Sequence, residues 1–302
     1  HFKTPAEFIQ WAFFLENSFM EISQVEAQSQ RVVKSYAWGN AVWHVWGADD
    51  AVPSETQGEA SGEPLVLLHG GSGSWTHWVR NVLHLAKYRT VWALDLPGCG
   101  DSDLPAGVAD ADDLVPYVAD IFNDTFQGKA VDVMGFSFGA MTAGLVAAAH
   151  AHAHLIRQLV LVGAPGLGLF GRDLPMRGML PDMDETAQRA VHRHNLNAMM
   201  FVHPDTVNED VVNLQQANVA RDRLRRRRIA RTDVLARAQA HWMCPVHGVW
   251  AEFDALYAGT LQQVPHVLAR METFTVVPDA GHWVMFERAD AFHAAIDPLL
   301  RR

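Results

Sequence analysis

A serine lies between two glycines near the middle of the chain, in the segment Gly135-Phe136-Ser137-Phe138-Gly139. The apolar residues 131–134 before it are typical of a buried strand, and a helix is expected from about Ala140. A strand that turns directly into a helix strains the backbone at the serine and leaves no room for side chains two residues to either side. Because glycine at both positions removes this clash, the pattern favours Ser137 as a nucleophile. The motif is short enough to arise by chance, so its partners decide its meaning.

A serine hydroxyl needs a histidine to take its proton and an acid to orient that histidine. The chain has 16 histidines. His282 is the candidate base, because it lies in a glycine-bearing loop that follows the apolar strand expected at 274–277. From that loop an imidazole can reach over the ends of neighbouring strands.

The candidate acid is Asp254, which follows the strand expected at 245–250 by a few residues. Two other acids remain alternatives. Glu252 lies closer to the end of that strand, and Asp279 is so near His282 that both are expected in one loop turn.

A glycine-rich loop, His69-Gly70-Gly71-Ser72-Gly73-Ser74, follows the short apolar strand expected at 65–68. Such a loop lets a backbone N–H approach a substrate oxygen and form one half of an oxyanion hole. Gly71 is the favoured donor and Ser72 the second choice, and the N–H of Phe138 would supply the other half. His69 is expected to be a structural hydrogen-bonding residue. The loop lacks the Gly-Lys-Ser/Thr that a phosphate-binding loop requires.

Short apolar strands alternate with helices over much of the chain, which favours an α/β fold with a mostly parallel, doubly wound sheet. Residues 32–47 read as a hairpin that turns at Gly39-Asn40. Further strands are expected at 65–68, 90–94, 131–134, 159–162, 245–250 and 274–277, and helices at 75–87, 111–126, 140–150 and 287–301.

The alternation stops between residues 166 and 241, where helical stretches predict an inserted cap. The predicted organisation is therefore an N-terminal helical extension (1–31), a core (32–165 and 242–302) and the cap. Residues 4–7 offer an N-cap, a proline and a capping-box glutamate, and an apolar stripe follows over residues 8–22. A polar, exposed loop is expected at 48–62.

These motifs resemble the α/β-hydrolase fold superfamily, whose triad follows the chain order serine, acid, histidine. The resemblance covers residues 32–302 and rests on His69-Gly-Gly, the segment Asp95 to Ser102, the serine motif, Asp254 and Gly281-His282. It implies a serine hydrolase with an acyl-enzyme intermediate, no cofactor and no metal. Small or aromatic carboxylic esters are the expected substrates. Dehalogenase and epoxide-hydrolase relatives carry aspartate at the nucleophile position, so those activities are disfavoured.

Residues 163–168 and Gly281-His282-Trp283 also resemble the meta-cleavage product hydrolases, which split carbon–carbon bonds. Two departures count against that group: Phe136 stands where it usually has asparagine, and no cap arginine for a substrate carboxylate is placed within 215–221. A non-catalytic, ligand-binding homologue is a further alternative. Four aromatic residues suggest an apolar substrate pocket, although core packing is the commoner role of each: Trp75, Phe136, Phe170 and Trp283.

The formal net charge of −10 disfavours binding to nucleic acid or to an anionic membrane surface. A small molecule is the expected partner, a homodimer is an open alternative, and the cytoplasm is the expected compartment. Residues 8–20 lack a following small-residue cleavage site, which disfavours a signal peptide, and the chain leaves an upstream leader open because it starts at His1.

Three further groups of residues have weak functional signals. Cys99 and Cys244 form neither a disulfide framework nor a metal motif. The tract His150-Ala-His152-Ala-His154 follows an expected helix, where alternate residues do not share a face, so a metal site there is disfavoured. The arginines 225–228, with Arg221, Arg223 and Arg231, could bind an acidic group, but a solvated helix face is expected.

Overall fold

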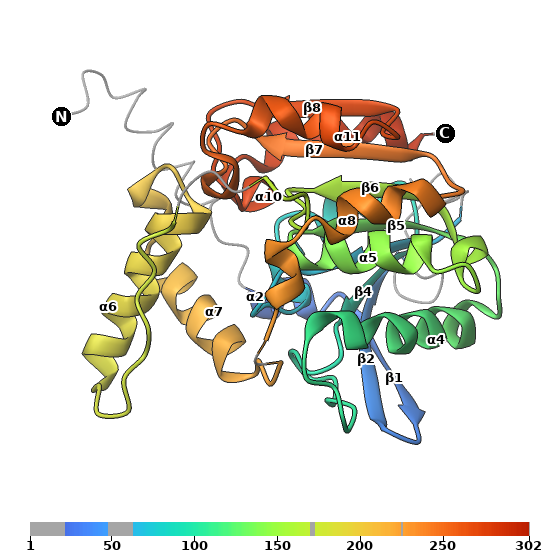
Figure 1. The fold of residues 1–302 in the computed structure, drawn as a ribbon. Helices are drawn as coiled ribbons and strands as arrows, with labels where there is room; N and C mark the ends of the chain where they lie inside the picture. The colour runs from blue at the N-terminus through green and yellow to red at the C-terminus, as the bar shows by residue number, and fades with distance from the viewer. Residues whose placement is uncertain (1–21, 48–62, 170–172, 225, 302) are drawn as a thin grey trace.

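A single sheet of eight strands runs through the part of the chain that the computed structural model describes, residues 22–47, 63–169, 173–224 and 226–301 (Figure 1). The strands are β1 (Gln30–Tyr36), β2 (Gly39–Trp46), β3 (Leu65–Leu68), β4 (Val91–Asp95), β5 (Val131–Phe136), β6 (Ile156–Val162), β7 (Val246–Ala251) and β8 (Thr273–Val277). They lie in the order β1-β2-β4-β3-β5-β6-β7-β8. β1 and β2 pair antiparallel, β2 runs antiparallel to β4, and the remaining pairs are parallel. The predicted α/β class is confirmed.

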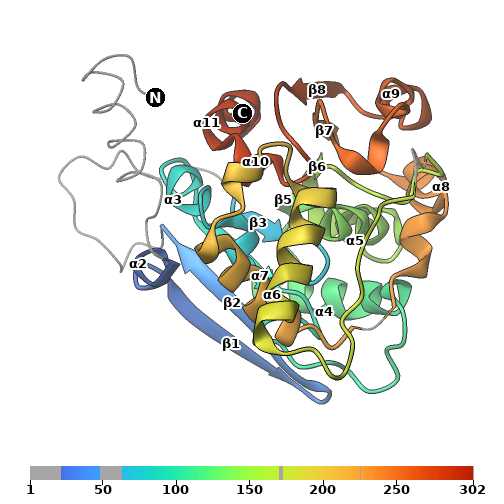
Figure 2. The same cartoon turned by 90° about the vertical axis from the view of Figure 1, so that its left-hand side faces the viewer.

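Helices cover both faces of this sheet (Figures 1 and 2). One face carries α4 (Val115–Phe126), α5 (Phe138–Ala148), α8 (Val234–Ala238) and α9 (Val264–Val267). The other carries α2 (Ile22–Glu26), α3 (Val82–Leu85), α10 (Val284–Glu287) and α11 (Ala289–Leu300). Each face has its own apolar cluster, so the central strands are buried on both sides, as their continuous apolar sequences require.

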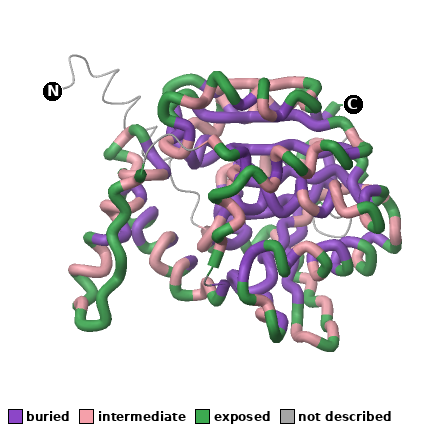
Figure 3. Tube along the Cα trace, viewed as in Figure 1, coloured by how far each residue is buried: buried purple, intermediate pink, exposed green. Residues whose placement is uncertain are grey.

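Two helices between β6 and β7 lie beyond the ends of the strand arrows in Figure 1. They are α6 (Glu185–Asn195), continued by a π-helical turn η4 (Leu196–Met200), and α7 (Glu209–Ala220). Figure 3 shows that α6 and the segment before it are more exposed than the sheet. Helices therefore occupy the span where the sequence predicts a cap, and the boundaries 166–241 remain a prediction.

The predicted hairpin turn at Gly39-Asn40 is wrong by two residues. Tyr36 pairs with Gly39, so the chain turns at residues 37–38. Gly39 has φ +131°, and a Cβ there would lie 2.6 Å from Cβ of Asp103. The Asn40 N–H donates to the Asp103 carboxylate over 2.8 Å. Glycine is therefore favoured at position 39 both by its positive φ and by the close approach of Asp103.

The helix predicted over 75–87 is also different in the structure. It consists of a 3-10 turn, η1 (Trp75–Trp78), and the short helix α3. The predicted N-terminal helix and the loop 48–62 lie outside the described residues, apart from Ile22 in α2. No helix among the described residues is long and apolar enough to cross a membrane.

Candidate active site

Ser137 occupies a sharp corner between β5 and α5. It has φ +50° and ψ −118°, and its N–H donates to the Val162 carbonyl over 2.7 Å. A Cβ on Gly135 would lie 2.5 Å from Cα of Ala140, and one on Gly139 would lie 2.4 Å from the His69 carbonyl oxygen. Both obstacles are backbone atoms, so the two glycines are required for the corner that exposes the serine.

Ser137, His282 and Asp254 form a continuous hydrogen-bonded chain. The His282 Nε2 lies 2.9 Å from the Ser137 Oγ, and its Nδ1 lies 2.8 Å from Oδ2 of Asp254. His282 and Asp254 are both buried. Because a carboxylate accepts at Nδ1, the imidazole hydrogen belongs there, and Nε2 is free to accept the serine proton.

The two alternative acids have other hydrogen-bond and ion-pair partners than His282. Glu252 accepts the Asp279 N–H over 2.9 Å. Asp279 pairs with Arg288 and His203, and the hydrogen bond from Arg288 lowers the pKa of the Asp279 carboxyl. Of the three acids predicted, the structure places Asp254 against the imidazole.

Two residues to which the sequence analysis gives no role support the position of His282: Gly163 leaves room for its ring, and Glu287 binds its loop. Gly163 has φ +56°, and a Cβ there would lie 3.1 Å from Cε1 of His282. Glu287 is buried and accepts the N–H groups of Gly281 over 2.6 Å and of Val202 and His203 over 2.9 and 2.8 Å. Glu287 thereby ties the loop of His282 to the chain after η4. The available signal was an acidic residue at the end of an otherwise apolar stretch, Trp283 to Phe286.

The two predicted oxyanion donors are neighbours. A Cβ on Gly71 would lie 3.7 Å from Cβ of Phe138. Phe138 is the first residue of α5, where a backbone N–H has no acceptor within the helix. Ser72, the second choice, has φ +49° and donates its hydroxyl to Oδ2 of Asp222 over 2.6 Å.

His69 has a hydrogen-bonding role in this loop, as the sequence predicts. The Leu96 N–H donates to its Nε2 over 2.9 Å, so its hydrogen lies on Nδ1 and is donated to the Gly70 carbonyl oxygen over 2.7 Å. Burial lowers the pKa of His69 to about 4, which keeps the imidazole neutral.

Three of the four aromatic residues predicted to line a pocket, Trp75, Phe136 and Trp283, are buried in the core, and their pocket role stays a prediction. Trp75 is buried, and its ring contacts His44 and Trp46 on β2, with centroid distances of 5.0 and 5.2 Å. Phe136 and Trp283 are fully buried. Core packing is the commoner role of large apolar side chains such as these. Phe170 lies outside the described residues.

The arginine run is largely exposed, as expected, at Arg223, Arg226, Arg228 and Arg231, but the expected helix is wrong over most of it, and only Arg228–Arg231 form a 3-10 turn. α7 ends at Ala220, and residues 222–224 and 226–227 are not helical. Several arginines also bind the core: Arg221 pairs with Asp101, Arg223 donates to the Gly100 carbonyl oxygen, Arg227 pairs with Asp222 and Arg228 pairs with Asp110. Asp101, Gly100 and Asp110 are remote in sequence, so local charge patterning could not reveal those contacts, whereas Asp222 lies five residues before Arg227.

Comparison with known proteins places this geometry in a family. The sequence model of the α/β-hydrolase family matches residues 65–295. The chain belongs to the α/β-hydrolase family. It is 28% identical over 259 residues to the dihydrolipoyllysine-residue acetyltransferase component of the acetoin cleaving system of Pseudomonas putida, a match that covers 81% of this chain and 65% of that protein.

Two other similarities concern hydrolases. The chain is 34% identical over 111 residues to a 2-hydroxy-6-oxo-2,4-heptadienoate hydrolase of Pseudomonas putida, covering 35% of this chain and 39% of that protein. It therefore spans less than two thirds of either curated relative. The crystal structure of a serine hydrolase involved in carbazole degradation superposes with a TM-score of 0.63 at 19% identity, covering 91% of this chain and 100% of that chain. This last likeness concerns the fold alone.

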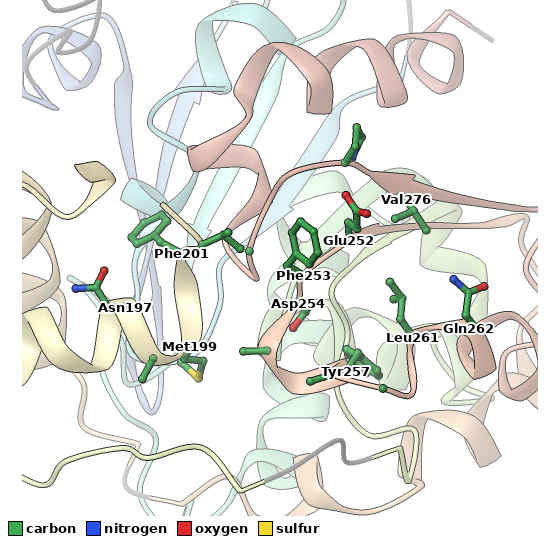
Figure 4. A pocket seen from close by; sticks show the side chains of 17 residues that line it. Asn197, Met199, Phe201, Glu252, Phe253, Asp254, Tyr257, Leu261, Gln262 and Val276 are labelled. Carbon is green, nitrogen blue, oxygen red and sulfur yellow. The ribbon is translucent and has the colours of Figure 1, made fainter. Parts of the chain in front are cut away.

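A cavity of about 840 Å³ lies beside the acid of this α/β-hydrolase (Figure 4). Its wall includes Asp254 and Gly281, so it adjoins the histidine loop. The other labelled residues come from η4 and its continuation and from the chain after β7: Asn197, Met199, Phe201, Glu252, Phe253, Tyr257, Leu261 and Gln262, with Val276 from β8. The lining mixes polar and apolar groups, and it includes neither Ser137 nor His282.

In the part of the chain that the structure describes, one group of three side chains has the spacing of metal ligands: His44, Asp95 and Asp101. Asp95 already accepts the N–H groups of Trp75 and Asp101 over 2.8 and 2.9 Å. Asp101 pairs with Arg31 and Arg221. The carboxylates of this α/β-hydrolase are thus committed to structural contacts at that place.

Proposed function

We propose that this α/β-hydrolase is a serine hydrolase that cleaves small or aromatic carboxylic esters through an acyl-enzyme. The observation that carries the proposal is the hydrogen-bonded chain from Ser137 through His282 to Asp254. The backbone N–H groups of Gly71 and Phe138 would complete the site as oxyanion donors.

In the proposed reaction, Nε2 of His282 accepts the Ser137 proton while Oγ attacks the ester carbonyl carbon. The carbonyl oxygen becomes an anion that accepts hydrogen bonds from the two backbone N–H groups. His282 then gives its proton to the leaving alcohol as the acyl-enzyme forms. Water, deprotonated by the same imidazole, attacks the acyl carbon and releases the acid and the free serine.

Ser137→Ala tests the nucleophile. Loss of a triad serine lowers turnover on the order of a million-fold, so ester hydrolysis by this variant should fall to background. Ser35→Ala is a matched control, because Ser35 is exposed on β1 and its hydroxyl donates to Asn40. Unchanged esterase activity in Ser137→Ala would contradict the proposal.

A fluorophosphonate probe separates this enzyme from a ligand-binding homologue. A working nucleophile attacks the probe and becomes covalently modified at Ser137, which peptide mass spectrometry detects. A folded sample that remains unlabelled would favour the binding protein.

Cleavage of a carbon–carbon bond is the second candidate, because the Pseudomonas putida relative is a 2-hydroxy-6-oxo-2,4-heptadienoate hydrolase. Phe136, which packs against His282 at a centroid distance of 5.1 Å, occupies the position where the meta-cleavage group usually has asparagine. A panel that sets p-nitrophenyl esters against a ring-opened dienoate discriminates the two reactions. We expect turnover of the esters, and turnover of the dienoate alone would favour the second candidate.

A further inference from the structure

His77 is a fully buried histidine in η1, outside the predicted triad. Its Nδ1 accepts the Gly70 N–H over 3.1 Å, so the hydrogen of the neutral imidazole lies on Nε2. That Nε2 is buried and has no hydrogen-bond partner among the described residues. Burial also lowers the pKa of His77 well below its usual value, in keeping with a neutral ring.

The surroundings of His77 would suit an ordinary apolar aromatic residue. Its ring lies 4.6 Å from that of Trp283 and 5.6 Å from that of Phe136, measured between centroids. An apolar ring would avoid the cost of an unpaired buried N–H. The acceptor at Nδ1 is what an imidazole provides and a phenyl ring does not.

Gly70 is held on both of its backbone groups. Its N–H is bound by His77, and its carbonyl oxygen accepts a hydrogen bond from Nδ1 of His69. That carbonyl and the Gly71 N–H belong to one planar trans peptide, in which they point in opposite directions. The His69 bond thus orients this peptide directly, and the His77 bond fixes the preceding peptide plane. Together the two bonds restrict φ and ψ of Gly70 and so set the direction of the Gly71 N–H.

Close packing around Gly70 leaves this loop little freedom. A Cβ on Gly70 would lie 2.8 Å from the Phe136 ring, and one on Gly73 would lie 2.2 Å from Cε1 of His77. The His77 carbonyl oxygen also accepts the indole N–H of Trp283 over 3.0 Å. His77 thus connects the oxyanion loop with the residue that follows His282.

We propose that His77 is a positioning residue for the oxyanion hole: by accepting the Gly70 N–H, it holds the Gly71 N–H in the direction of the developing oxyanion. This role rests on the proposed serine-hydrolase function. His77 acts through Gly70 and takes no part in proton transfer.

Two substitutions separate the acceptor from the ring. His77→Phe keeps an aromatic side chain and removes the acceptor. His77→Asn removes the ring but keeps an acceptor, because the asparagine Oδ1 is bonded to Cγ as Nδ1 is in histidine. Removing one oxyanion donor altogether costs about 100- to 1000-fold in kcat. Because His77→Phe would misdirect a donor without removing it, we expect kcat for p-nitrophenyl acetate to fall by about 10- to 100-fold, with KM changed little. His77→Asn should recover most of the loss.

The decisive readout is binding of an alkyl boronic acid. Nε2 of His282 takes the Ser137 proton as Oγ becomes the fourth ligand on boron, which leaves a tetrahedral boronate anion whose oxygen lies in the oxyanion hole. Its inhibition constant should rise in His77→Phe by a factor close to the loss in kcat/KM, as expected for a transition-state analogue. A purely structural defect would lower the fraction of active enzyme, so rates are normalised to the sites titrated by a fluorophosphonate. His84→Phe, in α3, is the matched histidine control and should leave both constants unchanged.

Folded His77→Phe with wild-type kcat and boronate affinity would overturn the positioning role, as would His77→Asn that is no better than His77→Phe. Wild-type protein that neither hydrolyses esters nor reacts with the fluorophosphonate would overturn the proposed function, and this role with it. Wild-type activity combined with unaffected His77 variants would overturn the positioning role alone.

Discussion

Replacing Asp254 by asparagine puts the orientation of His282 to a direct test. Oδ2 of Asp254 accepts from Nδ1 of the imidazole over 2.8 Å, and Oδ1 accepts the Leu256 N–H over 3.0 Å. Asparagine has only one oxygen. If that oxygen keeps the Leu256 N–H, the amide NH₂ faces Nδ1, which must then accept. The imidazole hydrogen moves to Nε2, and the ring can no longer take the proton of Ser137.

The amide could instead turn over and place its NH₂ against the Leu256 N–H. Two buried donors would then face each other, at a cost of about 1–3 kcal/mol, or about 5- to 150-fold in population. If the turned form were fully active, the loss in kcat would equal this population penalty, which is the smallest loss expected. If only the favoured form with the wrong tautomer were present, the loss in kcat would be larger, and an equivalent change in a serine protease lowers kcat by about 10⁴-fold. We expect Asp254→Asn to lose about 10²- to 10⁴-fold in kcat.

Initial rates on p-nitrophenyl acetate measure this loss, with circular dichroism and urea unfolding to establish that the variant is folded. Asp279, in the loop of His282, gives a matched control. Asp279→Asn should remain within about threefold of wild type, because the Asp279 carboxylate pairs with Arg288 and His203. The reasoning is refuted if Asp254→Asn keeps wild-type turnover, or if the control loses as much.

Two further predictions concern the scaffold. Gly139→Ala places a Cβ 2.4 Å from the His69 carbonyl oxygen, so we expect a loss of about 1–3 kcal/mol in the free energy of unfolding and slower fluorophosphonate labelling; Gly178→Ala, which meets nothing within 4 Å, should change neither. Burial lowers the pKa of three histidines to about 4: His44, His69 and His293. Between about pH 6.5 and 4 these histidines bind protons in the unfolded chain but stay neutral in the folded protein. Their contribution to the free energy of unfolding is therefore fully present above about pH 6.5 and falls toward pH 4, by up to about 1.4 kcal/mol per pH unit for each fully shifted histidine. Burial raises the pKa of Asp95 to about 6, so its titration offsets the effect of about one of these histidines. Urea unfolding at several pH values measures the net effect. A free energy of unfolding that does not fall from pH 7 to pH 4.5 would contradict the prediction.

The sequence allowed the sheet, the serine corner and its partners to be predicted because their signals are local. Apolar runs mark strands that are buried on both faces. Glycines are required on either side of Ser137 because the strand-to-helix turn brings these positions against the backbone of Ala140 and His69. His282 and Asp254 each follow a strand closely, and the carboxyl ends of parallel strands meet at one edge of a sheet. Residues whose role depends on remote partners were missed. Glu287 binds backbone groups of Gly281 and of residues 202–203, and the sequence around Glu287 gives no sign of its contact with residues 202–203.

The segment between β6 and β7 contacts two loops of the proposed site through residues that are distant in sequence. Buried Asn218 of α7 accepts the Ser74 hydroxyl over 2.8 Å, and Asp222 accepts that of Ser72 over 2.6 Å, so the segment is fastened to the oxyanion loop. Through Glu287, the residues after η4 are fastened to the loop of His282. The same segment therefore holds both the donor side and the base side of the proposed site. Substitutions in it should alter turnover as well as substrate preference, because moving the segment also moves the groups that carry out the chemistry.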